Sequence, residues 1–168
     1  QVGGSSATQN MKLATNVARV IDTLLTTTMN ERIPGEVPLQ IVQPGLTLLA
    51  SRQLPNGLNN LSLTTEKLDS KSARVVFPND LSNQLVTTRD SSTVFQVQMV
   101  SYNGNPYAWS ALSQNISASV LTVNLKTTLG QNVKMNNLKA PVVFTIPAMI
   151  TQYPLQTSND QCVLEPTY

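Results

Sequence analysis

Three aromatic residues, Tyr102, Tyr107 and Trp109, form the densest group of side chains that could contact a ligand. Exposed aromatic rings combine a large apolar face with a polar edge, which suits the binding of sugars. Residues 103–106, Asn-Gly-Asn-Pro, have the composition of a hairpin turn. After such a turn, Tyr107 and Trp109 would anchor the following segment against a core. The core role is the simpler interpretation, and a ligand site is the alternative.

The residues that usually carry out catalysis are absent or scattered. The chain has no histidine, which removes the usual general base of a serine or cysteine triad and the commonest metal ligand. None of the seven glycines belongs to a phosphate-binding loop. Asp80, Asp90 and Asp160 could together ligate calcium, although acidic residues are too sparse for a dedicated cage. We therefore expect no enzymatic activity, no cofactor and no resident metal.

Cys162 is the single cysteine of the chain. It is either a buried thiol of an intracellular protein or half of a disulfide whose partner lies beyond Tyr168. Two sequons, at Asn60 and Asn115, match the acceptor pattern for N-linked glycosylation. Because the chain is rich in Asn, Ser and Thr, such matches also arise by chance, and they are glycosylation sites only in a secreted chain.

The overall composition limits the classes of partner. A length of 168 residues with 40% apolar residues is enough for one compact domain. The eleven basic residues are scattered and the net charge is only +2, so we expect no nucleic-acid partner. No apolar run is long enough to span a membrane within this segment. The chain begins with Gln1 and lacks a signal-peptide pattern, so we interpret it as a mature or excised piece of a longer protein.

The beginning of the chain changes from a flexible composition to a helical pattern. Residues 1–7 are predicted to be a flexible lead-in. From residue 8 to residue 30, apolar residues recur at helical spacing, which predicts one amphipathic α-helix. The pattern consists of Leu13, Val17, Val20 or Ile21, and Leu24, widened by Ala14, Ala18 and Leu25.

Residues 31–168 are predicted to form an antiparallel β-sandwich, so the chain is mainly β. Short segments of period-2 alternation are separated by turn residues, as is typical of sandwiches. The segments are 37–43, 46–52, 61–64, 74–77, 93–101, 119–125 and 142–146. In 93–101 the odd-numbered side chains should face a core, while Gln96 and Gln98 should face water. The last two segments are joined by turn sequences, and we expect them to pair with each other.

Several stretches, taken in order, carry a family resemblance. They are the Ala/Val-rich helix around 16–18, Ile-Pro-Gly-Glu at 33–36, Asn-Pro-Tyr-Ala-Trp at 105–109, the strand 119–125, and Leu-Lys-Ala-Pro-Val-Val-Phe-Thr-Ile-Pro at 138–147, with Cys162 about fifteen residues later. This order resembles the sandwich half of a GAIN domain, the extracellular module that precedes the first membrane span in adhesion receptors and polycystin-like proteins. The stretches at 105–109 and 138–147 resemble the polycystin branch, which includes ciliary members. The resemblance covers residues 10–168.

The resemblance implies that the leading helix is the last helix of a helical subdomain and that Cys162 forms a disulfide with a downstream cysteine. Family members continue after this cysteine with an aromatic residue, a Trp, further cysteines and a His-Leu-Ser/Thr cleavage site. Here Val163 and Leu164 follow instead, and no histidine exists. The sequence would therefore stop before the end of the cleavage-site motif, and autoproteolysis is assigned to none of its residues.

The role implied by the resemblance is that of a non-catalytic structural or mechanosensory domain. It would lie on the extracellular face of the cell or ciliary membrane, as part of a larger glycoprotein. Its partners would be the rest of the same polypeptide and other surface proteins or glycans. Two alternatives stay open: an adhesin or carbohydrate-binding sandwich that uses Tyr107 and Trp109, and a capsid, pilus or fibre subunit that assembles through exposed sheet edges.

Overall fold

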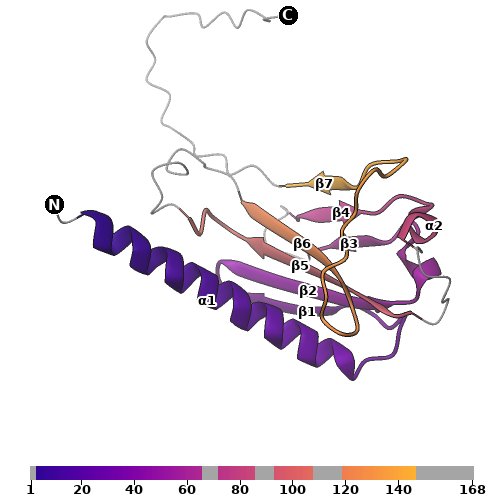
Figure 1. Ribbon diagram of the computed structural model, residues 1–168, viewed down its shortest axis with the longest axis horizontal. Helices are drawn as coiled ribbons and strands as arrows, with labels where there is room; N and C mark the ends of the chain where they lie inside the picture. Colours follow the sequence, from indigo (N-terminus) through magenta and orange to yellow (C-terminus); the bar gives the residue numbers. More distant parts are fainter. Residues whose placement is uncertain (1–2, 66–71, 86–92, 108–118, 147–168) are drawn as a thin grey trace, which may run out of the picture.

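The computed structural model describes residues 3–65, 72–85, 93–107 and 119–146. Within these residues the chain forms one long helix and two antiparallel sheets (Figure 1). The prediction of a mainly β chain with an N-terminal helix is confirmed. Among the described residues, no helix combines the length and the apolar character that a membrane crossing requires.

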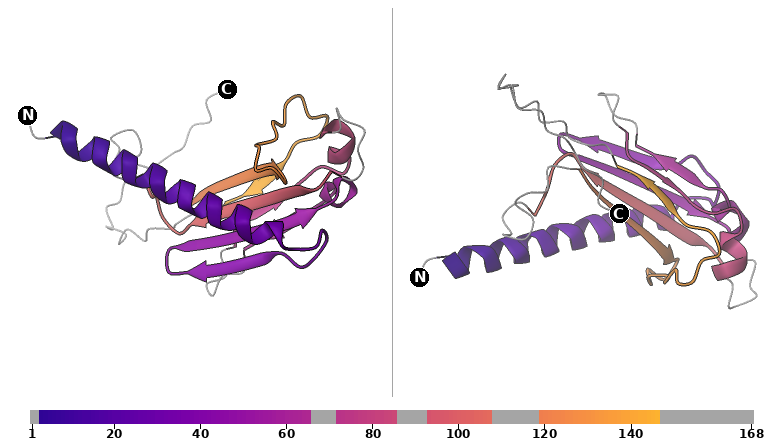
Figure 2. Two further views of the ribbon diagram at one scale, coloured as in Figure 1. Left: turned by 60° about the horizontal axis from the view of Figure 1, so that its bottom comes forward. Right: turned by 90° about the horizontal axis from the view of Figure 1, so that it is seen from above.

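Helix α1 spans Gly3–Asn30 and crosses one face of the larger sheet (Figure 2). It begins five residues before the predicted start at Thr8, so it takes in most of the segment expected to be a flexible lead-in. No proline interrupts residues 3–30, and extending an existing helix costs far less than starting one. The C-terminal half of α1 lies over the sheet, whereas the N-terminal half extends beyond it (Figure 2).

Only part of the apolar surface of α1 contacts the sheet. Ile21, Leu25 and Met29 lie four residues apart on one face and are 8%, 1% and 0% exposed; we call them the buried row. A second row is 44% to 65% exposed and is called the exposed row; its members are Leu13, Val17, Val20 and Leu24. The sequence pattern placed Ile21 and Leu25 in one stripe with the exposed row and did not include Met29. The stripe is wider than the face that the sheet covers.

The larger sheet has four antiparallel strands in the order β1-β2-β5-β6. The strands span Leu39–Gln43, Leu46–Gln53, Phe95–Tyr102 and Val120–Thr127, respectively. Gly45 joins the first two with a φ of 82°, a conformation that glycine adopts without strain. The predicted segments end within two residues of these strands, because their side chains alternate between two distinct environments.

The smaller sheet has three antiparallel strands in the order β3-β4-β7. These short strands span Ser62–Thr64, Arg74–Val76 and Val143–Thr145. Two further helical turns, η1 at Pro55–Leu58 and α2 at Leu81–Leu85, were not predicted. Segments of four or five residues are too short to show a helical period.

Strands β6 and β7 do not pair with each other, which corrects the expectation from the sequence. β6 pairs with β5 in the larger sheet, and β7 pairs with β4 in the smaller one. Residues 128–142 between them are too many for a tight hairpin. Residues 131–133 fold back onto the end of β6: Asn132 forms a bridge with Lys126, Thr127 N donates to Gln131 O at 2.9 Å, and Val133 N donates to Leu125 O at 2.8 Å. The rest of the connection crosses from one sheet to the other.

The larger sheet is covered on both faces. Its inner face shares an apolar core with the smaller sheet, in which Val97 and Met99 pack with Leu63 and Val75. Its outer face shares a second core with the buried row of α1; the sheet residues of that core include Leu48, Ala50 and Val100. The larger sheet is therefore the middle layer between α1 and the smaller sheet.

Candidate functional site

A row of polar side chains runs along α1 beside the buried row. Asp22, Thr26 and Asn30 are four residues apart and so share one side of the helix; we call them the polar row. Each accepts a hydrogen bond from the larger sheet. The donors are Lys126 Nζ to Asp22 Oδ1, Gln98 Nε2 to Thr26 Oγ1 at 3.0 Å, and Gln96 Nε2 to Asn30 Oδ1 at 2.8 Å. A shift of α1 by one turn would break all three contacts, so they fix its position along the sheet.

The sheet side of these contacts is almost fully buried. Gln96, Gln98 and Lys126 are 0%, 1% and 4% exposed, which corrects the expectation that Gln96 and Gln98 face water. They face α1 instead. Removing one partner from a buried hydrogen bond costs about 1–3 kcal/mol, and more when the group left behind is charged. Lys126 is therefore tolerated at this depth because Asp22 pairs with it.

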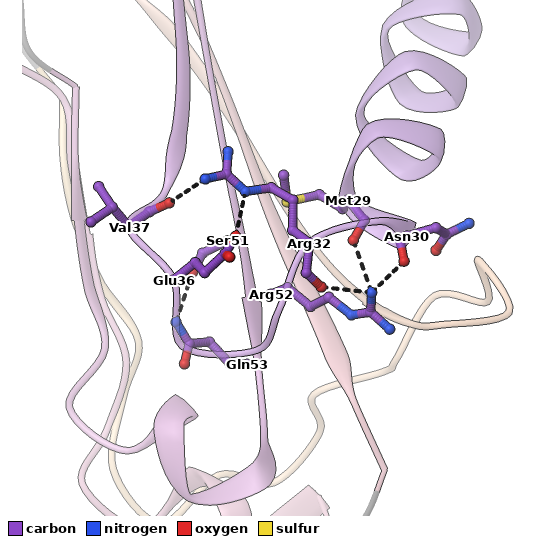
Figure 3. Close-up of polar contacts among 8 residues, drawn as sticks. All are labelled: Met29, Asn30, Arg32, Glu36, Val37, Ser51, Arg52 and Gln53. Carbon is purple, nitrogen blue, oxygen red and sulfur yellow. Dashed lines mark hydrogen bonds and ion pairs between the residues drawn. The ribbon is translucent and has the colours of Figure 1, made fainter.

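The guanidinium of Arg52, on β2, binds the C-terminal end of α1 (Figure 3). Arg52 Nη1 donates hydrogen bonds to the carbonyl oxygens of Met29 at 3.2 Å, of Asn30, and of Arg32 at 2.8 Å. The last carbonyls of a helix have no partner within the helix, and they carry its negative dipole end. The last turn of α1 contains no basic residue, so β2 supplies the positive charge.

The segment after α1 is held against the same strand. The predicted turn at residues 33–36 is present: Glu36 N donates to Ile33 O at 3.3 Å, and Gly35 has a φ of 88°. Gly35 N donates to Arg52 O at 2.8 Å. Arg32 forms an ion pair with Glu36 at 3.1 Å and donates from Nη2 to Val37 O at 3.2 Å (Figure 3). The segment that follows α1 is thus held by the side chain of Arg52 and by its backbone carbonyl.

The aromatic residues singled out from the sequence lie at the other end of the interface. Tyr102 and Tyr107 line a cavity of about 220 Å³ with Pro106 and the α1 residues Asn10, Leu13, Ala14 and Val17. Burial, followed by the charge of the neighbouring Tyr107, raises the pKa of Tyr102. Tyr107 is 39% exposed, and its backbone N–H donates to Asn105 Oδ1 at 2.9 Å. The lining is mainly apolar, which suits an apolar group better than a sugar.

The other residues proposed from the sequence are only partly described. Asn60 is exposed in a turn, with a φ of 56°. Trp109, Asn115 and Cys162 lie outside the described residues. The roles predicted for Trp109, Asn115 and Cys162 therefore stay predictions.

Acidic residues do not gather into a metal site in the described part of the chain, where no group of three or more His, Cys, Asp or Glu side chains could hold an ion. Of the three aspartates considered for calcium, Asp80 precedes α2, while Asp90 and Asp160 lie outside the described residues.

The polar row is the part of this site that sequence reasoning missed. Its spacing of four residues was visible in Asp22, Thr26 and Asn30, and Lys126 directly follows the alternating segment 119–125. Nothing in the sequence, however, connected these side chains with their partners, which are 66 to 104 positions away. The contacts join a helix to a sheet and present no group of atoms arranged for a reaction. No family model matches this chain.

Proposed function

We propose that this chain is a non-catalytic structural domain within a larger extracellular protein. It would mechanically couple the part of the polypeptide attached to α1 with the part attached to β7. The observation that carries the proposal is the docking of α1, in which the polar row and Arg52 bind one end of a long helix to the middle layer of the fold. A helix held in this way moves with the sheet as one body.

The arrangement of the contacts suits resistance to force along the helix axis. The three contacts of the polar row follow one another along α1, so a pull along the axis strains them at the same time. The buried row adds the free energy of removing three large side chains from water, about 1.5–3 kcal/mol for each. Arg52 adds charge-assisted hydrogen bonds at the end of the helix. Separation along the axis therefore requires all of these contacts to break together.

The resemblance to the sandwich half of a polycystin-like GAIN domain supports an extracellular, membrane-proximal position. On this proposal the two sheets are the two layers of a β-sandwich, and the exposed row of α1 is the surface on which other helices of a helical subdomain pack. An apolar stripe at helical spacing is a usual contact surface between helices. The domain would then hold the membrane region of a ciliary or cell-surface protein in a fixed relation to its ectodomain.

Single-molecule force spectroscopy tests this role. The full chain, carrying Cys162→Ser, is held through cysteines at Gln9 and Thr145, both of which are exposed. We expect α1 and the larger sheet to unfold in one step. Arg52→Ala removes the bonds at the end of α1 and should produce an earlier, separate release of the helix. Arg74→Ala is the matched control, since Arg74 is exposed and contacts Ser62 instead of α1.

Two results would contradict the proposal. The first is a separate release of α1 at low force in the chain with Arg52 intact. The second is an equal loss of force in the Arg52→Ala and Arg74→Ala variants, which would show that the bonds to α1 do not determine the resistance.

A further inference from the structure

The cavity that Tyr102 and Tyr107 line has an apolar and uncharged wall. Its lining on α1 includes Leu13, Ala14 and Val17. Among the described residues of the lining, only an asparagine and the two tyrosines have polar side chains, and none is charged. A concave, mainly apolar wall with a few polar groups is the usual form of a small-molecule site. The part of a ligand that enters this cavity should therefore be apolar and uncharged.

A second cavity, of about 110 Å³, adjoins the first, because the same two tyrosines line both. Its lining includes the polar side chains of Thr122 and Asn124 on β6. Asp22 also lines it, but Asp22 Oδ1 accepts a hydrogen bond from Lys126 Nζ, so a cation already pairs with this carboxylate. The second cavity thus suits a polar group without a net charge.

The volume of the first cavity indicates the size of the apolar group. An apolar cavity of about 150 Å³ holds one benzene ring. The first cavity, of about 220 Å³, exceeds that volume by the amount that a second fused ring would need. Tyr102 and Tyr107 favour an aromatic group over an aliphatic one, because aromatic rings attract one another beyond the gain from burying their area. The cavity therefore fits two fused aromatic rings.

We propose that the two cavities form one binding site for a small, uncharged aromatic molecule, with two fused rings in the first cavity and a hydroxyl or amide substituent in the second. Thr122 and Asn124 can donate and accept the hydrogen bonds of this substituent. The ligand is a free molecule: tryptophan, the one side chain with two fused rings, carries no substituent on its far ring.

A bound molecule would join the N-terminal half of α1, which extends beyond the sheet, to the end of β5 (Figure 2). On one side it contacts Leu13 and Val17, and on the other it contacts Tyr102. Because the complete site exists only in the folded chain, the ligand should raise the melting temperature. The inference rests on the two cavities and does not depend on the proposed coupling role.

Nuclear magnetic resonance of the 168-residue chain, labelled at the Ile, Leu and Val methyl groups, tests the proposal. Indole should shift the signals of Leu13 and Val17 with a dissociation constant of about 1 mM, as ligand efficiency allows for a molecule of its size. Leu24 is the internal control, since it lies on α1 and lines neither cavity. Hydroxyindole should also shift Val100, in the second cavity, and should bind about two- to tenfold more tightly through its added hydrogen bond.

A cavity-filling substitution locates the binding site. Ala14→Phe places a ring in the first cavity from the side of α1 and should weaken indole binding at least about tenfold. Thr15→Phe is the matched control, because Thr15 is exposed and lines neither cavity; it should leave the affinity unchanged. The signal of Ile21, in the buried row, reports whether α1 stays docked in both variants.

Further probes test the class and the source of the ligand. Methyl glucoside lacks an aromatic ring and octanoate carries a charge, so both should bind more weakly than indole. A capped Gly-Trp-Gly peptide presents the indole ring as part of a protein chain and should bind more weakly than hydroxyindole. Trp109 follows Tyr107 by two residues, so the Trp109→Ala variant tests competition from within the chain. Indole should bind it no more tightly than it binds the unchanged chain.

Four results would overturn the proposal. One is the absence of saturable shifts at Leu13 and Val17 with either indole up to about 10 mM, ten times the expected dissociation constant. Another is binding of methyl glucoside or octanoate as tightly as indole. The third is an unchanged affinity in the Ala14→Phe variant. The fourth is tighter binding of the capped peptide, or of indole to the Trp109→Ala variant, which would assign the cavity to a protein side chain.

Discussion

Replacing Leu25 and its neighbour Leu24 by alanine, one at a time, tests which face of α1 is docked. Leu25 is 1% exposed and belongs to the buried row, whereas Leu24 is 48% exposed and belongs to the exposed row. Both positions lie in the same turn of the helix, and the change from Leu to Ala alters helix propensity equally at each. Any difference between the variants therefore reports contact with the sheet.

The expected costs differ severalfold. At Leu25 the substitution removes a fully buried side chain and leaves a cavity, which lowers the free energy of unfolding by about 3 kcal/mol. At Leu24 about half of the side chain already contacts water, and solvent fills the space left behind, so the loss should stay below about 1 kcal/mol. At about 2–4 °C per kcal/mol for a chain of this size, the melting temperature should fall by about 6–12 °C for Leu25→Ala.

The assay is urea unfolding of the full chain, followed by circular dichroism and compared with thermal unfolding. The midpoint should fall for Leu25→Ala with an unchanged dependence on urea, which indicates a loss of stability without a change in the surface exposed on unfolding. Equal losses in the two variants, or a larger loss for Leu24→Ala, would show that the exposed row is the docked one.

Two further predictions concern single side chains. Because burial raises the pKa of Tyr102, the unfolded chain releases this proton first above about pH 10; stability should therefore fall as pH rises through that range, and Tyr102→Phe should reduce the fall measured by urea unfolding. An equal fall in that variant would contradict the assignment. When the chain is expressed through a secretory pathway, glycosidase treatment should shift its mass at Asn60, and Asn60→Asp, which also tolerates the left-handed backbone of this turn, should lose that shift. A chain without glycan at Asn60 would weaken the extracellular proposal.

The strands were predictable because each is defined by its own residues. Alternation in 46–52 and 93–101 reports two faces with different surroundings, and the observed strands β2 and β5 end within two residues of those limits. The nature of the second face was not predictable from alternation. Gln96 and Gln98 are polar because they bind α1. In a sequence, polar residues that bind a helix alternate with apolar residues in the same way as polar residues that face water.

Contacts between residues that are far apart in the sequence could not be predicted from such local patterns. The strands that pair with β6 and β7 depend on how residues 128–142 cross between the sheets. The turn residues in this connection do not determine the course that it takes. The same holds for Lys126, whose partner Asp22 is 104 residues away. The cavity beside Tyr107 was anticipated only as a cluster of aromatic residues, because the contribution of α1 to its wall depends on the docking angle of the helix.

Because α1 projects beyond the sheet, the resistance of the domain to force should depend on the direction of the force. From Ile21 to Asn30, about 14 Å at about 1.5 Å per residue, α1 is held by the buried row and the polar row. From Asn10 to Val17 it only borders the cavity that Tyr102 and Tyr107 line. A sideways force at the start of α1 would therefore separate the helix from these tyrosines first, and would then break the three polar contacts in succession, beginning with that of Asp22 and Lys126. The domain should thus resist bending less than it resists tension.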